Sequence, residues 1–289
     1  MAVVAGEALI AALRDDIDRL LAAEPEVRAD ASDSVHQMRV ATRRLRSVLR
    51  SYRGLFEKAP AAEIGAELKW LATLLGVARD AEVRADRFAD LLDDQGEDVP
   101  DVVAERLVGA ERARYDAAHA EVLTALDTDR YRALRERLTR WRTDPPLRPA
   151  RAAAPAVDFF GVVLLRDHER VAALIRHEPT VPGPERIEAL HDIRKSAKRL
   201  RYSCEAAEQV IGESAADLGH RAKRLQTVLG DHRDAVESGE AIIERAAEAE
   251  AAGEDVNVYR RLTVAENAAA DRALSRYPET AEALSTSLW

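Results

Sequence analysis

Two segments of this sequence recur in the same order, one copy in each half of the chain, and this recurrence constrains the fold most. Residues 35–46 read VHQMRVATRRLR, and residues 190–201 read LHDIRKSAKRLR. A second pair follows, because residues 69–81 read KWLATLLGVARDA and residues 223–235 read KRLQTVLGDHRDA. Two independent matches in one order predict a tandem duplication of a single unit.

The unit that is duplicated is predicted to be helical. Apolar residues recur with helical periodicity, and no segment shows the alternation typical of a strand. Charged residues make up 33% of the chain and aromatic residues only 4%, which is typical of long, surface-charged helices. The expected fold class is therefore all-α, with each repeat forming an antiparallel helical bundle.

Proline, glycine and small polar residues mark the expected ends of the helices. The predicted breaks lie near residues 25–34, 57–60, 93–100, 127–129, 143–155, 179–184, 211–214 and 253–256. The break at 143–155 contains four prolines and divides the chain into nearly equal halves. We predict one domain over residues 1–289, with a first repeat at 1–143, a Pro-rich linker at 144–155 and a second repeat at 156–289.

The first recurring segment forms a row of positive charge when it is drawn as a helix. At about 100° per residue, one arc of roughly 100° holds all its regularly spaced basic residues, while apolar residues occupy the opposite face. The basic arc contains His36, Arg39, Arg43, Arg46, Arg50 and Arg53. In the second half the matching arc contains His191, Arg194, Lys198 and Arg201. We call these two sets the basic stripes.

The basic stripes are costly for an isolated helix. Like charges three or four residues apart destabilise a helix by about 0.2–0.5 kcal/mol per pair. No Asp or Glu lies between Asp33 and Glu57 to relieve this repulsion. A solvated helix face is one interpretation, but a cost that occurs twice favours neutralisation by a bound anion or by buried acidic partners. Glu205 and Glu208 end the second stripe, so the first is expected to bind more strongly.

The second recurring segment adds candidate polar contacts on one helix face. That face contains Lys69, Thr73, Gly76 and Asp80 in the first half, and Lys223, Thr227, Gly230 and Asp234 in the second. The lysines are candidates to contact phosphate, and each glycine either allows close approach of another group or ends its helix. The two aspartates are expected to hold an arginine that lies off the stripes, and the candidates are Arg44 and Arg199.

Several bulk properties limit the function. A net charge of −9 means that the whole molecule should repel nucleic acid and anionic membranes, so anion binding must depend on local clustering. The single cysteine, Cys204, is expected to be a buried apolar residue and indicates a reducing compartment. Residues 1–13 lack a basic leading region and are interpreted as a first amphipathic helix, not as a signal peptide. We expect a cytoplasmic, monomeric protein without a membrane span.

The sequence resembles the CHAD domain family (conserved histidine α-helical domain). The resemblance lies in His-x-x-Arg-Val-x-x-Arg-Arg-Leu-Arg at 36–46, its second copy at 191–201, the Leu-Gly-x-x-Arg-Asp segments at 75–80 and 229–234, and Asp-Arg-Tyr-Arg at 129–132. It implies two helical bundles related by a pseudo-two-fold axis, with basic residues lining a central cavity. Members of the family are regarded as polyphosphate-binding modules, and some are fused to a triphosphate-tunnel domain. No Glu-x-Glu-x-Lys signature of that domain occurs here, so a stand-alone module is expected.

The resulting hypothesis is non-catalytic binding of inorganic polyphosphate in a basic cleft between the two repeats, with no cofactor or metal. The predicted binding residues are His36, Arg39, Arg43, Arg46, Arg50, Lys69, His191, Arg194, Lys198, Arg201 and Lys223. Arginine guanidinium groups suit phosphate oxygens because they form charge-assisted, bidentate hydrogen bonds. Polyphosphate granules are a predicted place of association within the cytoplasm.

Three alternatives remain open at this point. A nucleic-acid-binding module would normally interleave aromatic residues with its basic groove, and the first stripe lacks them, since Tyr52 falls on the apolar face. A metal-dependent phosphohydrolase would use His191 and Asp192 with further ligands. These further ligands would be His220 or His232 and Asp231 or Asp234. A scaffold would present its stripes to acidic protein partners.

Overall fold

The computed structural model describes residues 3–96 and 99–285, and these residues form helices joined by short connections. The main helices are α1 (Ala5–Arg28), α2 (Ser34–Ser51), α3 (Lys58–Asp93), α5 (Ala110–Leu126), α6 (Asp129–Trp141), α8 (Ala156–His177), α9 (Arg186–Ile211), α10 (Glu213–Ala251), α11 (Asn257–Ser275) and α12 (Tyr277–Ser285). Short turns complete them: α4 (Asp101–Ala104), the π-helical η1 (Glu105–Gly109), α7 (Pro149–Ala152), η2 (Glu178–Thr180) and η3 (Gly183–Glu185). The predicted all-α fold class is confirmed.

Helices begin and end close to the predicted breaks. Gly212 and Gly253 follow the last residues of α9 and α10, and their φ of 75° is a conformation that glycine adopts at little cost. Pro25 lies inside α1, so the first break starts later than predicted. The break between α11 and α12 was not predicted, because Pro278 stands in the first turn of α12, where proline is tolerated. Residues 1–2, 97–98 and 286–289, which the predicted ranges include, lie outside the described residues.

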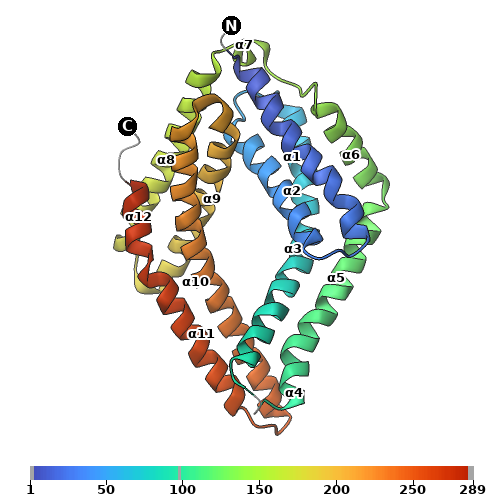
Figure 1. Ribbon diagram of the computed structural model, residues 1–289, viewed down its shortest axis with the longest axis vertical. Helices are drawn as coiled ribbons and strands as arrows, with labels where there is room; N and C mark the ends of the chain where they lie inside the picture. Colours follow the sequence, from blue (N-terminus) through green and yellow to red (C-terminus); the bar gives the residue numbers. More distant parts are fainter. Residues whose placement is uncertain (1–2, 97–98, 286–289) are drawn as a thin grey trace.

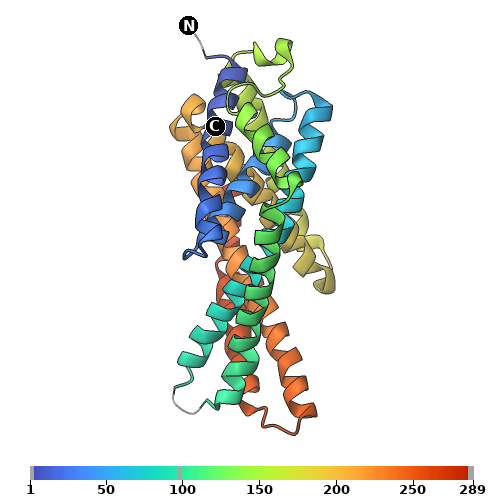
Figure 2. The same cartoon turned by 90° about the vertical axis from the view of Figure 1, so that its right-hand side faces the viewer.

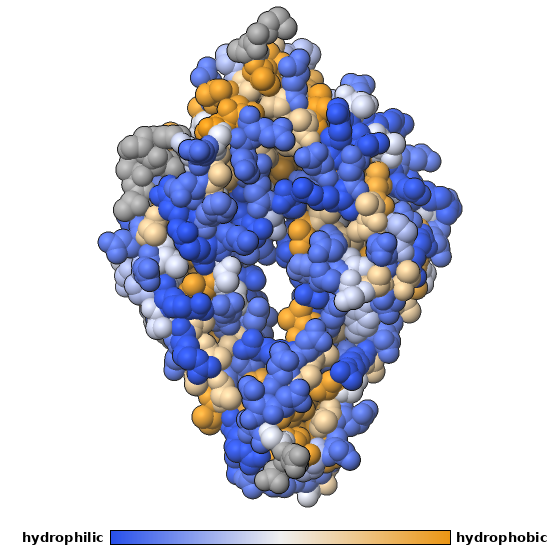
Figure 3. Space-filling model, in the orientation of Figure 1, coloured by the Kyte–Doolittle hydropathy of each residue, from blue (hydrophilic) through white to orange (hydrophobic). Residues whose placement is uncertain are grey.

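The helices surround an open centre. In Figure 1, α1, α2, α3, α5 and α6 form one side of a diamond, and α8 to α12 form the other. Seen from the side in Figure 2, the molecule is elongated and much narrower than in Figure 1. The space-filling view in Figure 3 shows an opening through the middle of the molecule, between the sides to which α3 and α10 belong.

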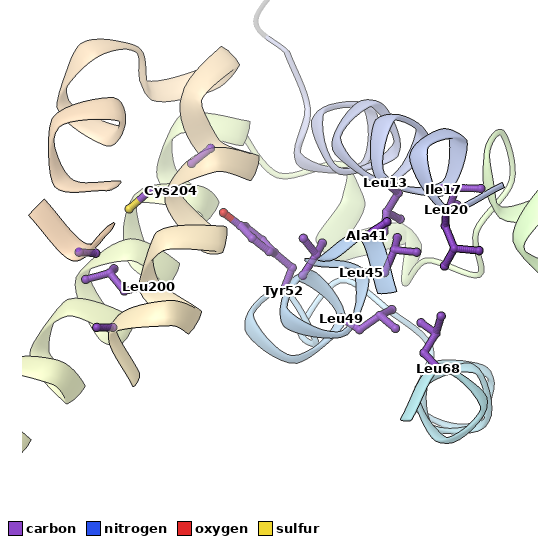
Figure 4. Packing of buried hydrophobic residues seen from close by; sticks show 14 of the residues in the cluster. Leu13, Ile17, Leu20, Ala41, Leu45, Leu49, Tyr52, Leu68, Leu200 and Cys204 are labelled. Carbon is purple, nitrogen blue, oxygen red and sulfur yellow. The ribbon is translucent and has the colours of Figure 1, made fainter. Parts of the chain in front are cut away.

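A large hydrophobic core joins the two sides at one end of the diamond. Figure 4 shows Leu13, Ile17 and Leu20 of α1 above the apolar face of α2, which presents Ala41, Leu45 and Leu49. Tyr52 is fully buried, as predicted, and its hydroxyl donates a hydrogen bond to the Ser203 carbonyl of α9 at 2.8 Å. Cys204, also buried as predicted, belongs to the same core. Burial of each large aliphatic side chain contributes about 1.5–3 kcal/mol.

A second, smaller core closes the ring at the other end. Phe88 and Leu107, near the end of α3 and in η1, pack in one cluster with Ile242 and Leu262 of α10 and α11. Arg87 forms a bidentate ion pair with Glu266, a carboxylate with no solvent exposure. The two hydrophobic clusters therefore lie at the two ends of the ring. The helix faces between them are free to carry charge.

No helix among the described residues combines the length and the apolar character needed to cross a bilayer. The arrangement of the two halves as a duplicated unit related by a pseudo-two-fold axis stays a prediction.

Candidate functional site

A cavity of about 790 Å³ lies between α2 and α3 on one side and α9 and α10 on the other. Its basic lining residues are His36, Arg39, Arg43, Arg79, Arg84, Arg87, His191, Arg194, Lys198 and Arg233. Its acidic lining residues are Asp80, Asp234, Glu237, Glu240 and Glu244. Positive groups from both sequence halves thus meet in one cavity of a protein whose net charge is −9.

The two basic stripes face each other closely enough to interact. Burial, and then the charges of Arg43, Arg194 and Arg39, lower the pKa of Lys198 from 10.5 to about 7. Arg43 and Arg39 belong to α2, whereas Lys198 and Arg194 belong to α9. The repulsion therefore crosses the cavity between the two halves, as the stripes predict.

Two stripe residues contain buried donors that lack a partner. The Nε atoms of Arg43 and Arg194 are inaccessible to solvent, and neither has a hydrogen-bond partner among the described residues. A buried donor left unsatisfied costs about 1–3 kcal/mol. Each half of the chain thus contributes one arginine with an unsatisfied Nε donor to the lining, and Ser238 of the second half adds an unsatisfied hydroxyl.

The second recurring segment positions one arginine of each stripe. The Arg39 guanidinium pairs with Asp80 at 3.0 Å. A Cβ atom placed on Gly76 would lie 3.8 Å from the Nε atom of Arg39. In the second half a Cβ atom on Gly230 would lie 3.4 Å from the Nε of Arg194. Gly76 and Gly230 lie inside α3 and α10, so the interpretation as helix ends is wrong. Each glycine instead lets a guanidinium group lie against the helix.

Asp234 is the counterpart of Asp80, and it acts on Arg194. Burial raises the pKa of Asp234, while Arg194 opposes this rise. Burial likewise lowers the pKa of Arg194, and Asp234 opposes that change. The two recurring segments of each half therefore meet in space, with glycine providing room for the arginine and aspartate balancing its charge.

Each stripe begins with a histidine that lies beside an arginine of the second segment. Burial and the nearby Arg79 lower the pKa of His36. Burial and Arg233 do the same for His191, whose Nδ1 atom is in contact with the Arg233 guanidinium. Arg79 and Arg233 were not predicted as site residues. They occupy matching positions in the recurring Arg-Asp dipeptide, and this was the signal that could have identified them.

The predicted partnership of Arg44 and Arg199 with Asp80 and Asp234 is wrong. Arg44 pairs with Asp16 of α1 at 2.6 Å and also with Glu205 of α9. Arg199 pairs with Asp167 of α8 at 3.1 Å. Both arginines lie off the stripes, on flanks of α2 and α9 that face the neighbouring helices α1 and α8. They tie those helices together instead of reaching the cavity.

Five predicted binding residues are not among those found to line the cavity: Arg46, Arg50, Lys69, Arg201 and Lys223. Arg201 lies one contact away, because it donates to Gln226, a lining residue, at 3.4 Å and to Glu205 at 2.7 Å. Burial and Arg50 lower the pKa of Arg46, which continues the first stripe beyond the cavity. Lys69 and Lys223 are exposed. A role of these residues in binding stays a prediction.

The far parts of α3 and α10 supply lining residues that were also not predicted. Arg84 and Arg87 follow Asp80 at helical spacing, and Glu237, Glu240 and Glu244 follow Asp234. They could have been predicted by extending each helix past its Arg-Asp dipeptide and taking the residues that fall on the same helix face. These residues place arginines on the α3 wall of the cavity and glutamates on the α10 wall. Arg87 is paired with Glu266, and Arg84 lies 3.9 Å from Glu111.

The ligand set of the phosphohydrolase alternative is not assembled. His191 contacts Arg233, and Asp192 pairs with Lys195 at 2.6 Å. In the described part of the chain, no group of three or more His, Cys, Asp or Glu side chains is arranged to hold a metal ion.

Fold and cavity together define an α-helical protein with a cavity between its two halves that is lined by many basic residues. The profile of the CHAD domain family matches residues 11–242, so the chain belongs to this family. It is 38% identical over 266 residues to two uncharacterized proteins of Mycobacterium tuberculosis, MT2285 of strain CDC 1551 / Oshkosh and Rv2226 of strain ATCC 25618 / H37Rv. These matches cover 90% of the chain but only half the length of either relative.

Two solved structures share the fold. PptA from Streptomyces chartreusis has a TM-score of 0.77 at 18% identity, over 96% of this chain and 99% of that protein. The CHAD domain from the plant Ricinus communis has a TM-score of 0.73 at 24% identity, over 98% of this chain and 93% of that domain. At these identities the likeness extends to the fold alone.

Proposed function

We propose that this chain binds inorganic polyphosphate, without catalysis, in the central cavity between its two halves. His36, Arg39, Arg43, His191, Arg194 and Lys198 contact phosphate oxygens there. Arg46, Arg50, Lys69, Arg201 and Lys223 extend the contacts to chains longer than the cavity. Asp80 and Asp234 orient arginines of the stripes, whereas Arg44 and Arg199 hold α2 and α9 against their neighbours.

The observation that carries the proposal is the unbalanced charge at the centre. Arg43 and Arg194 each hold a buried Nε donor without a partner among the described residues, and the charges of both arginines help burial to lower the pKa of Lys198. A chain of phosphates offers acceptors and negative charge to both halves at once. Hydrogen bonds to charged groups contribute about 1.5–3 kcal/mol each, so a few such contacts outweigh the repulsion.

The lining favours polyphosphate over a nucleic acid. Proteins that bind single strands stack bases on aromatic side chains. The residues found to line the cavity include two histidines but no Phe, Trp or Tyr. Polyphosphate needs only phosphate contacts, which this lining supplies.

The wider organisation is part of the same proposal. We infer a tandem duplication in which each half contributes one stripe to a shared cavity, so that a monomer is sufficient for binding. The buried Cys204 supports a cytoplasmic location, where polyphosphate granules would be a place of association.

Titration of the full chain with polyphosphate of defined length tests the proposal. A triple variant with the charge reversed at Arg39, Arg43 and Arg46 should bind at least about a hundredfold more weakly, because each substitution removes a charge-assisted contact and adds repulsion. Affinity of the unaltered protein should fall steeply with salt, as for other polyanions. Unchanged affinity in the triple variant would remove the proposed site.

A matched control uses three arginines that are exposed and lie outside the cavity lining, Arg112, Arg140 and Arg260. Their charge reversal changes the net charge by the same amount, and it should alter the affinity only a few-fold. Single-stranded DNA supplied at equal phosphate concentration should fail to displace polyphosphate. Displacement would favour the nucleic-acid alternative.

A further inference from the structure

A small chamber, separate from the cavity, opens beside it on the side of α9 and α10. Its volume is about 160 Å³. His191, Arg233, Glu237 and Glu240 line both the chamber and the basic cavity, so the two spaces adjoin across these side chains. A ligand held in the cavity can therefore extend into the chamber.

The inner walls of the chamber suit a flat, neutral ring. Leu190, Leu229, Val236 and the exposed Ile187 supply apolar surface, and His232 supplies an imidazole ring. Burial and Arg186 lower the pKa of His232, so the ring is neutral near pH 7 and can stack without added charge. A protein cavity of about 150 Å³ accommodates a benzene ring, so this volume is sufficient for one ring of a base. The second ring of a purine would lie at the mouth of the chamber, against the exposed Ile187.

The charges around the chamber differ from those of the cavity. Glu188, Glu237 and Glu240 line the chamber. Arg233 pairs with Glu237 at 2.6 Å, and Lys195 lies 3.6 Å from Glu188, so that the carboxylates outnumber the cation that lines the chamber. Carboxylates repel a further phosphate group, but they accept hydrogen bonds from ring amino groups. A ligand that spans both spaces must therefore be anionic at one end, and neutral with N–H donors at the other.

We propose that the chain binds nucleoside 5′-polyphosphates, with the phosphates in the basic cavity and an amino-bearing base in the chamber. This inference rests on the proposed function, since it requires that the cavity accepts phosphate groups. The chamber is a feature of the second half. The positions that correspond to Ile187, His232 and Val236 are Ser32, Ala78 and Glu82 in the first half. A nucleotide consequently binds in one orientation only.

Comparison of ATP with tripolyphosphate tests this inference, because the two have the same number of phosphates. Calorimetric titration of the full chain should give an affinity for ATP on the order of tenfold higher, as expected for one stacked base. Inosine triphosphate, which has a carbonyl in place of the adenine amino group, should bind more weakly than ATP. ATP binding no tighter than tripolyphosphate would overturn the inference.

Two variants separate the chamber from the cavity. Ile187→Trp fills the mouth of the chamber, and His232→Ala removes the stacking ring. Each should reduce ATP affinity to the level of tripolyphosphate while leaving tripolyphosphate affinity unchanged. Ser32→Trp, at the corresponding exposed position of the first half, is the matched control and should preserve the preference for ATP.

Failure of this inference can be distinguished from failure of the proposed function. If tripolyphosphate and polyphosphate bind but ATP gains nothing, only the chamber assignment is wrong. If ATP binds with a preference that Ile187→Trp abolishes, the chamber assignment holds even where long polyphosphate fails to bind. An Ile187→Trp variant that loses ATP and tripolyphosphate affinity equally would also overturn it.

Discussion

The two walls of the cavity are alike at their centre and different at their edges. At the centre, Arg39 lies against Gly76 near Asp80 in the first half, and Arg194 lies against Gly230 under the influence of Asp234 in the second. Beyond this centre, α3 continues with Arg84 and Arg87, whereas α10 continues with glutamates. The contacts that the two halves share position one arginine of each stripe. The residues further along α3 and α10 differ in charge, so the two walls should differ in what else they bind.

The same contrast holds at the other end of the stripes. Arg46 and Arg50 extend the first stripe, and the charge of Arg50 acts on Arg46. In the second half Glu205 occupies the position of Arg50 and pairs with Arg201 at 2.7 Å. The first stripe therefore ends in arginines without an acidic neighbour on the same helix, whereas the second stripe ends in an arginine that is paired with a glutamate. A long polyanion should follow the first half.

The largest expected effect tests whether both centres contribute equally. Arg43→Glu and Lys198→Glu change corresponding positions of the two stripes. Each should weaken polyphosphate binding about a hundredfold or more, because each replaces an attraction with a repulsion at the point where the stripes face each other. Equilibrium titration measures both, with Arg112→Glu as a control. Loss in only one of the two variants would show that a single half forms the site.

The next effect separates the halves by pH. With a pKa of about 7, Lys198 loses its charge near neutrality, whereas an arginine does not. Bound phosphate raises the pKa of Lys198, so the complex holds more protons than the free protein above pH 7. Affinity should consequently fall by up to about tenfold per pH unit as the pH rises above 7, until the pKa of the complex is reached. Lys198→Arg should abolish this dependence, and an unaltered pH profile in that variant would contradict the assignment.

A smaller effect should distinguish the outer parts of the stripes. Arg46→Ala together with Arg50→Ala should lower the affinity for long polyphosphate severalfold and hardly change the affinity for tripolyphosphate. Arg201→Ala should have less effect on either ligand, because Glu205 already neutralises its charge. Titration with chains of two lengths measures the difference. An equal loss for short and long chains would place Arg46 and Arg50 in the central contacts.

The smallest effect concerns the two glycines. Gly76→Ala should stabilise the protein by about 0.5–1 kcal/mol, because alanine favours the helix and its Cβ would meet Arg39 at an ordinary distance. Gly230→Ala should gain less, since its Cβ would lie closer to Arg194. Urea unfolding of both variants measures the free energies. A larger gain at Gly230 would show that Arg194 is not held against α10.

Much of the fold followed from periodicity and breakers, because helices of this length leave clear signals in the sequence. The stripe residues His36, Arg39 and Arg43 and their counterparts were identified, because recurrence at fixed spacing marks one face of a helix. The choice of partner for Arg44 failed. A helical wheel shows which face a residue occupies, but it does not show which neighbouring helix covers that face, and Asp16 of α1 covers Arg44.

Residues of the far walls were missed for a different reason. Arg84 and Glu240 acquire their position only because α3 and α10 continue as single long helices past the recurring segments and meet again at the second core. Closure of a ring depends on contacts between distant residues, such as Arg87 with Glu266, which no local pattern encodes. The small chamber beside His191 likewise arises from packing of α9 on α10.

The most direct measurement is a crystal structure of the full chain with bound polyphosphate. It should show phosphate oxygens within hydrogen-bonding distance of both Arg43 on α2 and Lys198 on α9, so that one anion bridges the two facing stripes. Phosphate bound only on the outer surface, with the central side chains unchanged, would contradict this account.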